Sequence, residues 1–87
     1  MQYVEVEPTS LFRQQMPYHI YLVAMQDFRI VGDVLSFCTE KFGKPSKISP
    51  YEVVPEAIVW ARSGQLFAFR HKRDALIVYV RFQGIAI

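Results

Sequence analysis

Residues 57–82 decide the fold of this chain, and they read AIVWARSGQLFAFRHKRDALIVYVRF. Two apolar runs flank the pair Ser63-Gly64, which is typical of a two-residue turn between antiparallel strands. With that pair as the loop, Trp60 lies opposite Phe67. Because side chains alternate across a strand, one face of the hairpin is predicted to carry Ile58, Trp60, Phe67 and Phe69, and the other Val59, Ala61, Leu66 and Ala68.

The aromatic face of this hairpin has two interpretations. Packed under a helix, the rings form the core of a two-layer domain. Left exposed, they form a surface on which a partner can stack. We favour the core, because the amphipathic helix predicted next needs an apolar sheet face to cover.

That helix is predicted over about residues 29–42. Its apolar residues recur at the spacing of one helical face, with polar residues off the stripe. Asp27 is a plausible N-cap, Gly43 occupies the position of a left-handed C-terminal residue, and Pro45 prevents continuation. The stripe consists of Val31, Val34, Leu35, Cys38 and Phe42.

Two further strands are predicted in the N-terminal part of the chain. Residues 18–25 are apolar on both sides and indicate a central strand, whereas residues 1–7 alternate and indicate an edge strand. Between them, Ser10 is predicted to cap one helical turn that ends before Pro17. Residues 44–55 contain three prolines and predict a crossing loop, with a short strand considered over residues 51–54.

Residues 75–82 permit both a strand and a helix. Ile77, Val78 and Val80 favour a strand by propensity. Asp74 as an N-cap and Gly84 as a terminator favour a helix instead. With a helix, the order β, α, β, β, α is that of a ferredoxin-like sandwich. The predicted fold is therefore α+β, a two-layer sandwich in which an antiparallel sheet is covered by the helix at 29–42, with or without a second helix at 75–82.

Length and composition set the class of protein. The chain has 87 residues, of which 52% are hydrophobic and 15% aromatic. One domain spanning residues 1–87 is expected, and a large enclosed active-site cavity is not. The apolar excess favours a homo-oligomer. Residues 1–40 are net acidic and residues 41–87 net basic, an asymmetry suited to an acidic partner or a head-to-tail self-contact.

The expected location is the cytoplasm. A single cysteine, Cys38, cannot form an internal disulfide and suits a reducing compartment. The N-terminal residues lack the pattern of a signal peptide. The longest apolar run, residues 75–80, is far shorter than the roughly 20 residues of a membrane span.

No catalytic, metal-binding or cofactor-binding motif is recognisable, and we predict a protein that is not an enzyme. His19, His71 and Cys38 are far apart and match no zinc-ligand spacing. Cys38 falls on the apolar stripe of the helix and is expected to be inert. The four glycines are isolated, which gives no phosphate-binding loop.

The candidate partner-binding residues are the charged run after the hairpin. An aromatic strand followed by cations looks a little like the third strand of an RNA-recognition motif, in which rings stack bases and cations contact phosphates. A single-stranded nucleic-acid-binding protein is therefore the alternative to a self-associating binding or assembly module. The candidate residues are Arg70, His71, Lys72 and Arg73.

Several short stretches also resemble small uncharacterised proteins of tailed bacteriophages and marine viruses. The stretches are residues 37–43 (FCTEKFG), Trp60, Phe67 with Phe69, and Asp74-Ala75 followed by residues 78–82, so the likeness covers about residues 18–84. The resemblance implies a helix opened by Asp74-Ala75 and a viral source. It brings no activity and no site residue with it. The surplus apolar face and the basic run 70–73 give the expected partners, which are a second copy of the chain, a host protein or a nucleic acid.

Overall fold

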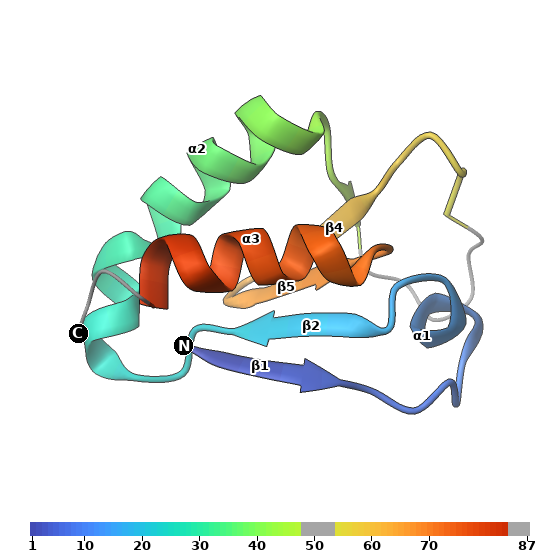
Figure 1. Cartoon of the computed structure of the whole chain (residues 1–87), viewed down its shortest axis with the longest axis horizontal. Helices are drawn as coiled ribbons and strands as arrows, with labels where there is room; N and C mark the ends of the chain where they lie inside the picture. The colour runs from blue at the N-terminus through green and yellow to red at the C-terminus, as the bar shows by residue number, and fades with distance from the viewer. Residues whose placement is uncertain (48–53, 84–87) are drawn as a thin grey trace.

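The fold combines an antiparallel sheet with two long helices on one of its faces (Figure 1). The computed structural model describes residues 1–47 and 54–83. Its strands are β1 (Gln2–Glu5), β2 (Tyr18–Tyr21), β3 (Ser46–Lys47), β4 (Trp60–Ser63) and β5 (Leu66–Phe69). Its helices are α1 (Leu11–Gln15), a 3-10 helix η1 (Met25–Ile30), α2 (Val31–Phe42) and α3 (Lys72–Gln83). The predicted α+β two-layer class is confirmed.

The strands are arranged in the order β1-β2-β5-β4-β3. All neighbouring pairs are antiparallel except β3 and β4, which are parallel, with Ser46 opposite Ala61. β2 lies between β1 and β5, so the central position predicted for residues 18–25 is confirmed, although the strand ends at Tyr21. β3 was not predicted, because two residues carry no readable periodicity.

The hairpin of β4 and β5 has a different turn from the one predicted. Trp60 pairs with Phe69, and Ser63 pairs with Leu66, so the loop is Gly64-Gln65. Gly64 has φ +57° whereas no described non-glycine residue has a positive φ, the pattern of a type II′ turn. The register thus differs by two residues from the prediction, and a shift of two leaves every strand side chain on its predicted face.

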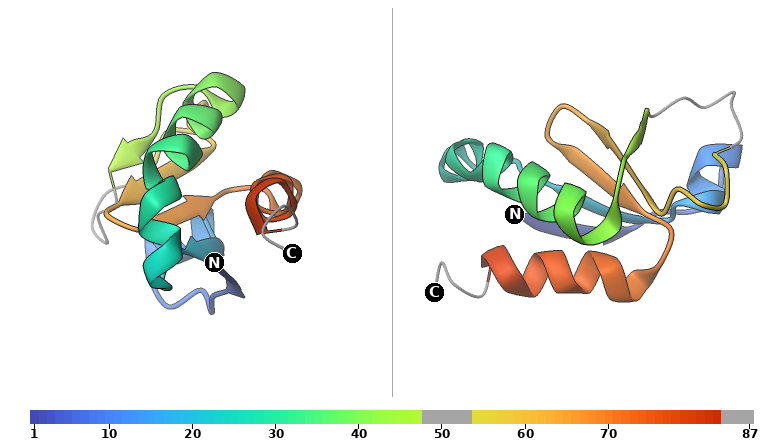
Figure 2. Two further views of the ribbon diagram at one scale, coloured as in Figure 1. Left: turned by 90° about the vertical axis from the view of Figure 1, so that its left-hand side faces the viewer. Right: turned by 90° about the horizontal axis from the view of Figure 1, so that it is seen from above.

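The aromatic face of the hairpin is the core of the domain. Trp60, Phe67 and Phe69 are each fully buried. The Trp60 indole lies nearly parallel to the Phe67 ring, at 6.1 Å between centroids, and its Nε1–H donates to the carbonyl oxygen of Gly43 at 2.8 Å. Both long helices cover this face of the sheet (Figure 2), through Val34 and Cys38 of α2 and Ala75 and Val78 of α3.

The opposite face of the sheet has a smaller apolar cluster. Phe12 and Met16, from α1 and its C-terminal end, pack there against Ala61 and Ala68. The Ser10 hydroxyl caps α1 by accepting the Arg13 backbone N–H at 3.2 Å, as predicted. Ile58 was predicted on the aromatic face but packs against this second cluster, because β4 begins only at Trp60 and the alternation does not extend to residue 58.

The predicted helix at 29–42 begins later than expected. α2 starts at Val31, and residues 29 and 30 belong to η1. Asp27 is not its N-cap: the Asp27 carboxylate accepts the Ala24 backbone N–H at 3.1 Å and pairs with the Met1 ammonium at 2.6 Å. Gly43 ends α2 with φ +86°, as predicted.

Residues 75–82 are helical, within an α3 that begins earlier, at Lys72. Asp74 is therefore the third helical residue and not the N-cap; in the first turn its carboxylate still opposes the positive end of the helix dipole. Ala75 and Val78 lie three residues apart and both face the sheet, as one face of a helix does. Burial of this face outweighs the β-propensity of the branched residues in the segment. The strand considered at residues 51–54 lies, except for Val54, outside the described residues.

Candidate functional site

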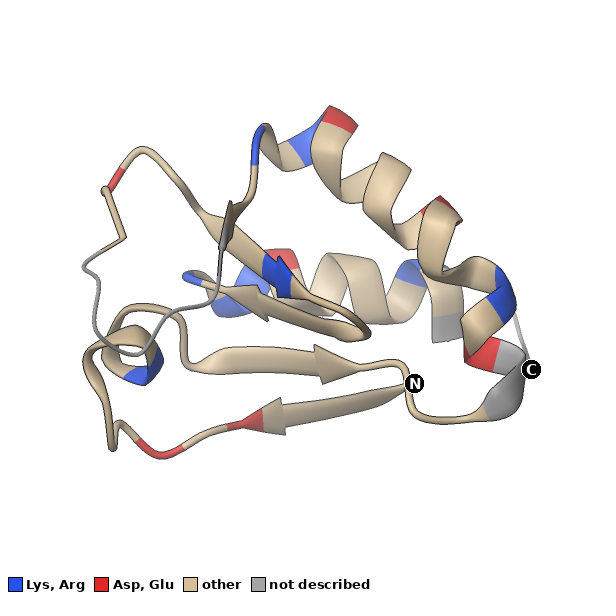
Figure 3. Ribbon diagram, turned by 180° about the vertical axis from the view of Figure 1, so that it is seen from behind, with Lys and Arg blue, Asp and Glu red and all other residues tan. Residues whose placement is uncertain are grey.

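The four predicted partner-binding residues lie where β5 passes into α3, but they do not form one surface. Figure 3 shows basic positions gathered at this passage and acidic positions along the end of β1. Arg70 follows β5 directly, and Lys72 and Arg73 form the first turn of α3. Because a helix turns by about 100° per residue, consecutive cations there point in different directions.

Arg70 is a structural residue. Its guanidinium donates to the carbonyl oxygens of Ile58 at 3.2 Å, Val54 at 3.3 Å and Pro55 at 3.2 Å. Its backbone N–H donates to the Val59 carbonyl oxygen at 2.9 Å. The side chain thus holds the segment that precedes β4 against the end of β5, through its Nε and Nη2 donors.

Lys72 and Arg73 diverge. The Lys72 ammonium lies 3.4 Å from the Glu5 carboxylate of β1, and both side chains are about half exposed. The Arg73 side chain is 81% exposed, and its Nε lies 3.7 Å from the buried carboxylate of Asp74. Lys72 therefore faces the β1 edge, whereas Arg73 faces the space between α2 and α3.

His71 and Arg73 do lie together. They line a cavity of about 440 Å³ between the end of α2 and the start of α3, to which α2 adds a further cation, Lys41. The sequence run 70–73 therefore contributes two of its four residues to a basic cavity, and Lys41 comes from a helix some 30 residues earlier. The remaining lining residues are Phe42, Val59, Asp74 and Ile77.

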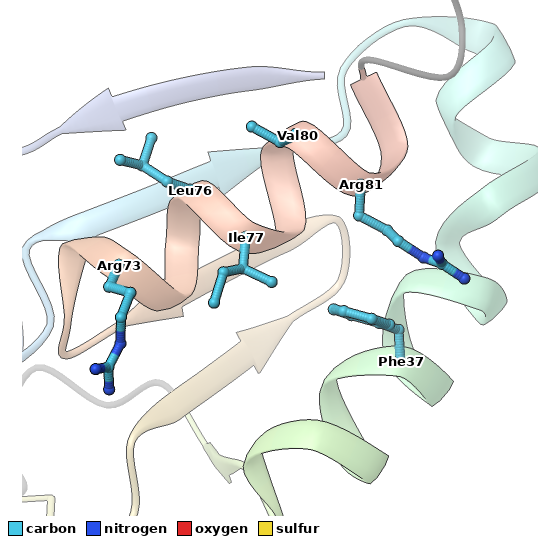
Figure 4. Close-up of a pocket in the computed structure, with 6 residues that line it drawn as sticks. All are labelled: Phe37, Arg73, Leu76, Ile77, Val80 and Arg81. Carbon is cyan, nitrogen blue, oxygen red and sulfur yellow. The ribbon is translucent and has the colours of Figure 1, made fainter.

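A larger apolar groove adjoins this cavity (Figure 4). It has a volume of about 670 Å³ and shares Arg73 and Ile77 with the basic cavity. In Figure 4, Leu76 and Val80 leave α3 toward β1, and Ile77 leaves it toward α2. Sequence reasoning missed this groove, although the excess of apolar residues around α3 was its signal. The lining residues are Phe37, Arg73, Leu76, Ile77, Val80 and Arg81.

Two of the residues considered for chemistry, Cys38 and His19, are buried. Burial raises the pKa of the Cys38 thiol to about 12. Burial also lowers the pKa of His19, whose Nε2 lies 2.8 Å from the Met16 carbonyl oxygen and whose Nδ1 lies 3.3 Å from the Tyr21 hydroxyl. A carbonyl can only accept, so Nε2 carries the proton and Nδ1 accepts from Tyr21. Within residues 1–47 and 54–83, no cluster of three potential metal ligands occurs.

The burial of the rings bears on the nucleic-acid alternative. Stacking of bases needs exposed aromatic faces, and Trp60, Phe67 and Phe69 are covered by the two helices. The hairpin rings therefore provide no stacking surface, and that part of the alternative is wrong. Among the described helices, none is long and apolar enough to span a bilayer.

Comparison with known proteins gives no family for this chain. No protein-family model, no curated protein and no solved structure matches it. The geometry of the surface is therefore the basis for any functional proposal.

Proposed function

We propose that the chain is a small, non-enzymatic binding and assembly module that associates with a second copy through the outer edge of β1. One observation carries the proposal: no described strand pairs with the outer edge of β1, and this edge lies beside exposed apolar side chains of α3. The Glu5–Lys72 ion pair and the Tyr3–Tyr79 ring contact, at 6.2 Å between centroids, place α3 along β1. Edge and helix can therefore be covered by one partner.

The outer side of β1 carries backbone groups for which residues 1–47 and 54–83 provide no partner strand. The Val6 N–H donates to the Pro17 carbonyl oxygen at 2.9 Å, and the same register places Val4 opposite His19. Because backbone groups alternate in direction along a strand, Val4 and Val6 direct theirs to β2, and Tyr3 and Glu5 direct theirs outward. An antiparallel second copy centred on Val4 pairs Tyr3 of one copy with Glu5 of the other.

The Tyr3 hydroxyl supports this pairing. Its oxygen is buried and has no acceptor at full hydrogen-bond geometry among the described residues, although the carboxylate of Glu5 in the same chain is near enough to act on it as a hydrogen-bond partner. Burial, followed by the nearby Glu5 carboxylate, raises the pKa of Tyr3, so the hydroxyl remains a donor at neutral pH. A buried donor without an acceptor costs about 1–3 kcal/mol. In the two-fold arrangement, Glu5 of the second copy lies opposite Tyr3 on the same sheet face and offers an acceptor.

The helix beside the edge adds apolar surface. Leu76 is 38% exposed and Val80 is 67% exposed, and both leave α3 toward β1 (Figure 4). The two-fold arrangement places these side chains against their equivalents. A charge such as that of Glu5 normally protects a strand edge from pairing, but here Lys72 balances it.

The molecular mass in solution tests the proposal. Size-exclusion chromatography with light scattering at tens of micromolar should give twice the 10.2 kDa of the chain. Leu76→Glu should give a monomer, because it places a carboxylate in the contact. The matched control is Leu11→Glu, which changes a 48% exposed leucine of α1 on the opposite sheet face and should leave the dimer intact.

A second variant tests the strand edge separately from the helix. Glu5→Pro removes an outward N–H, which proline can do at an edge without breaking the inner ladder. It should also give a monomer with an unchanged circular dichroism spectrum. A monomeric wild-type protein, or a dimer that survives both Leu76→Glu and Glu5→Pro, would overturn the proposal.

The remaining expectations belong to the same proposal. We place the module in the cytoplasm, which for a viral protein is that of the host cell, because its one cysteine is a free, buried thiol. The order β2, α2, β4, β5, α3 is the expected order β, α, β, β, α, and we propose a ferredoxin-like origin, with β1 as the additional edge strand. The likeness to phage and marine viral proteins stays a prediction.

A further inference from the structure

We infer that the groove between α2 and α3 binds an amphipathic helix of another protein, with the acidic end of that helix over the start of α3. This groove shares Leu76 and Val80 with the proposed dimer contact, and it adds Phe37 of α2 and Ile77, which leaves α3 toward α2 (Figure 4). A helix in the groove and a second copy on α3 therefore compete for these two shared side chains.

The middle of the groove is apolar and well supported. Phe37 forms its α2 wall, and Ile77, Leu76 and Val80 form its α3 wall. The Phe37 ring packs edge-to-face against Phe82, at 5.6 Å between centroids, and also against Phe42. These contacts hold the wall in place before any partner arrives, which lowers the entropic cost of binding.

The charge at one end of the groove determines which partner fits. Where α3 begins, the groove continues into the cavity lined by Lys41, His71 and Arg73. The Asp74 carboxylate is the one acidic group among the described residues lining that cavity, and its side chain is 8% exposed. The first turn of α3 adds its helix dipole. The accessible charge at this end is therefore positive, and it complements carboxylates.

The other end of the groove has mixed charge. Arg81 lies over the Phe37 ring at 5.4 Å and adjoins a cavity that is also lined by Asp33 and Glu40. A bound segment therefore meets cations at the start of α3, apolar side chains in the middle, and both signs of charge beyond Arg81. The segment that binds is therefore expected to have acidic residues at its first end and apolar residues along its middle.

A helix fits this site better than the other candidates. The groove runs along α3 between two helices, so an added helix continues the helical layer by the usual helix-in-groove mode. A second copy placed groove to groove would bring the arginines of both copies together. A nucleic acid would need a free ring for stacking, but Arg81 already covers the face of Phe37.

A designed peptide tests the inference directly. The probe is a fluorescein-labelled, alanine-based helix of about four turns, with glutamates in its first turn and leucines along one face. Fluorescence anisotropy should detect binding to the wild-type protein. A peptide with lysines in place of the glutamates should bind at least roughly tenfold more weakly, since like charges then face each other. Binding of the acidic peptide should weaken as salt is raised.

Two protein variants locate the site. Arg73→Glu changes an 81% exposed side chain and should weaken binding of the acidic peptide about tenfold or more without affecting folding. Phe37→Ala should weaken it by a similar factor, because it removes the apolar wall. The matched control is Arg13→Glu, which reverses an exposed charge of α1 on the opposite sheet face and should leave binding unchanged.

The outcomes separate this inference from the proposed dimer. Arg73→Glu should keep the mass of the wild-type protein in light scattering, so loss of peptide binding and loss of self-association are measured independently. Absence of peptide binding at about 1 mM, a weak affinity equivalent to roughly 4 kcal/mol, would overturn the inference. Binding that Arg73→Glu leaves unchanged would also overturn it, as would a single-stranded oligonucleotide that binds through Arg73 while the acidic peptide does not.

Discussion

Replacing Arg70 by methionine should destabilise the fold, whereas the same change at Arg73 should not. The two arginines lie three positions apart in one charged run, and the sequence gives no reason to distinguish them. In the structure, the Arg70 guanidinium donates to three backbone carbonyls of the segment before β4. Methionine keeps most of the apolar stem and removes only the donors.

The size of the expected loss of stability depends on which hydrogen bonds each carbonyl oxygen keeps when Arg70 is replaced. The Val54 oxygen retains the Gln15 side-chain amide at 3.0 Å, and the Pro55 oxygen retains the Ile58 backbone N–H at 3.0 Å. The Ile58 oxygen accepts from both Nε and Nη2 of Arg70 and has no other donor among the described residues. One orphaned carbonyl and the loss of a charged donor correspond to about 2 kcal/mol.

Urea denaturation followed by circular dichroism measures this difference. With an m-value of about 1 kcal/mol/M, a loss of about 2 kcal/mol lowers the midpoint of Arg70→Met by roughly 2 M. Arg73→Met should stay within about 0.5 kcal/mol of the wild-type protein, as exposed substitutions do. Equal midpoints for the two variants would refute the structural role of Arg70.

Three further predictions concern stability and reactivity. Burial alone would raise the pKa of Asp27, but hydrogen bonds from the Met1 ammonium and two backbone N–H groups lower it. The ionised carboxylate therefore stabilises the fold above the unfolded pKa of about 3.9, and this stability is lost as the pH falls through the lowered pKa. Acid titration should show this loss in the wild-type protein but not in Asp27→Asn. Cys38 should react with Ellman's reagent only on unfolding, because its thiol is buried with a pKa of about 12; fast labelling of the native protein would contradict this. Gly64→Ala should cost roughly 1–2 kcal/mol at φ +57°, whereas Gly32→Ala, in open space within α2, should stabilise by about 0.5–1 kcal/mol, both measured by thermal melting.

The parts of the fold that the sequence predicts are those governed by local periodicity. The stripe from Val31 to Phe42 gives the buried face of α2, and the alternation around Trp60 and Phe67 gives the core face of the hairpin. The turn was misplaced because Gly64 can occupy either central position of a two-residue loop. Periodicity is the same in both registers, so only cross-strand packing decides between them.

The parts that the sequence could not predict depend on contacts between distant residues. Asp27 looks like an N-cap by its position, but its partner is the Met1 ammonium, 26 residues away. Arg70 looks like a surface cation until the carbonyls of residues 54–58 are placed beside it. For the same reason Lys41 was not grouped with His71 and Arg73, because the basic cavity forms only when α2 packs beside α3.

The single tryptophan makes the core of this protein observable by its own fluorescence. Trp60 is fully buried, and its indole N–H reaches the residue that ends α2. A blue-shifted emission maximum therefore reports both an apolar core and a docked helix terminus. Any variant or ligand that loosens the end of α2 admits water to the indole, and the emission then moves to longer wavelength. The chain thus contains an intrinsic reporter of tertiary packing that requires no label.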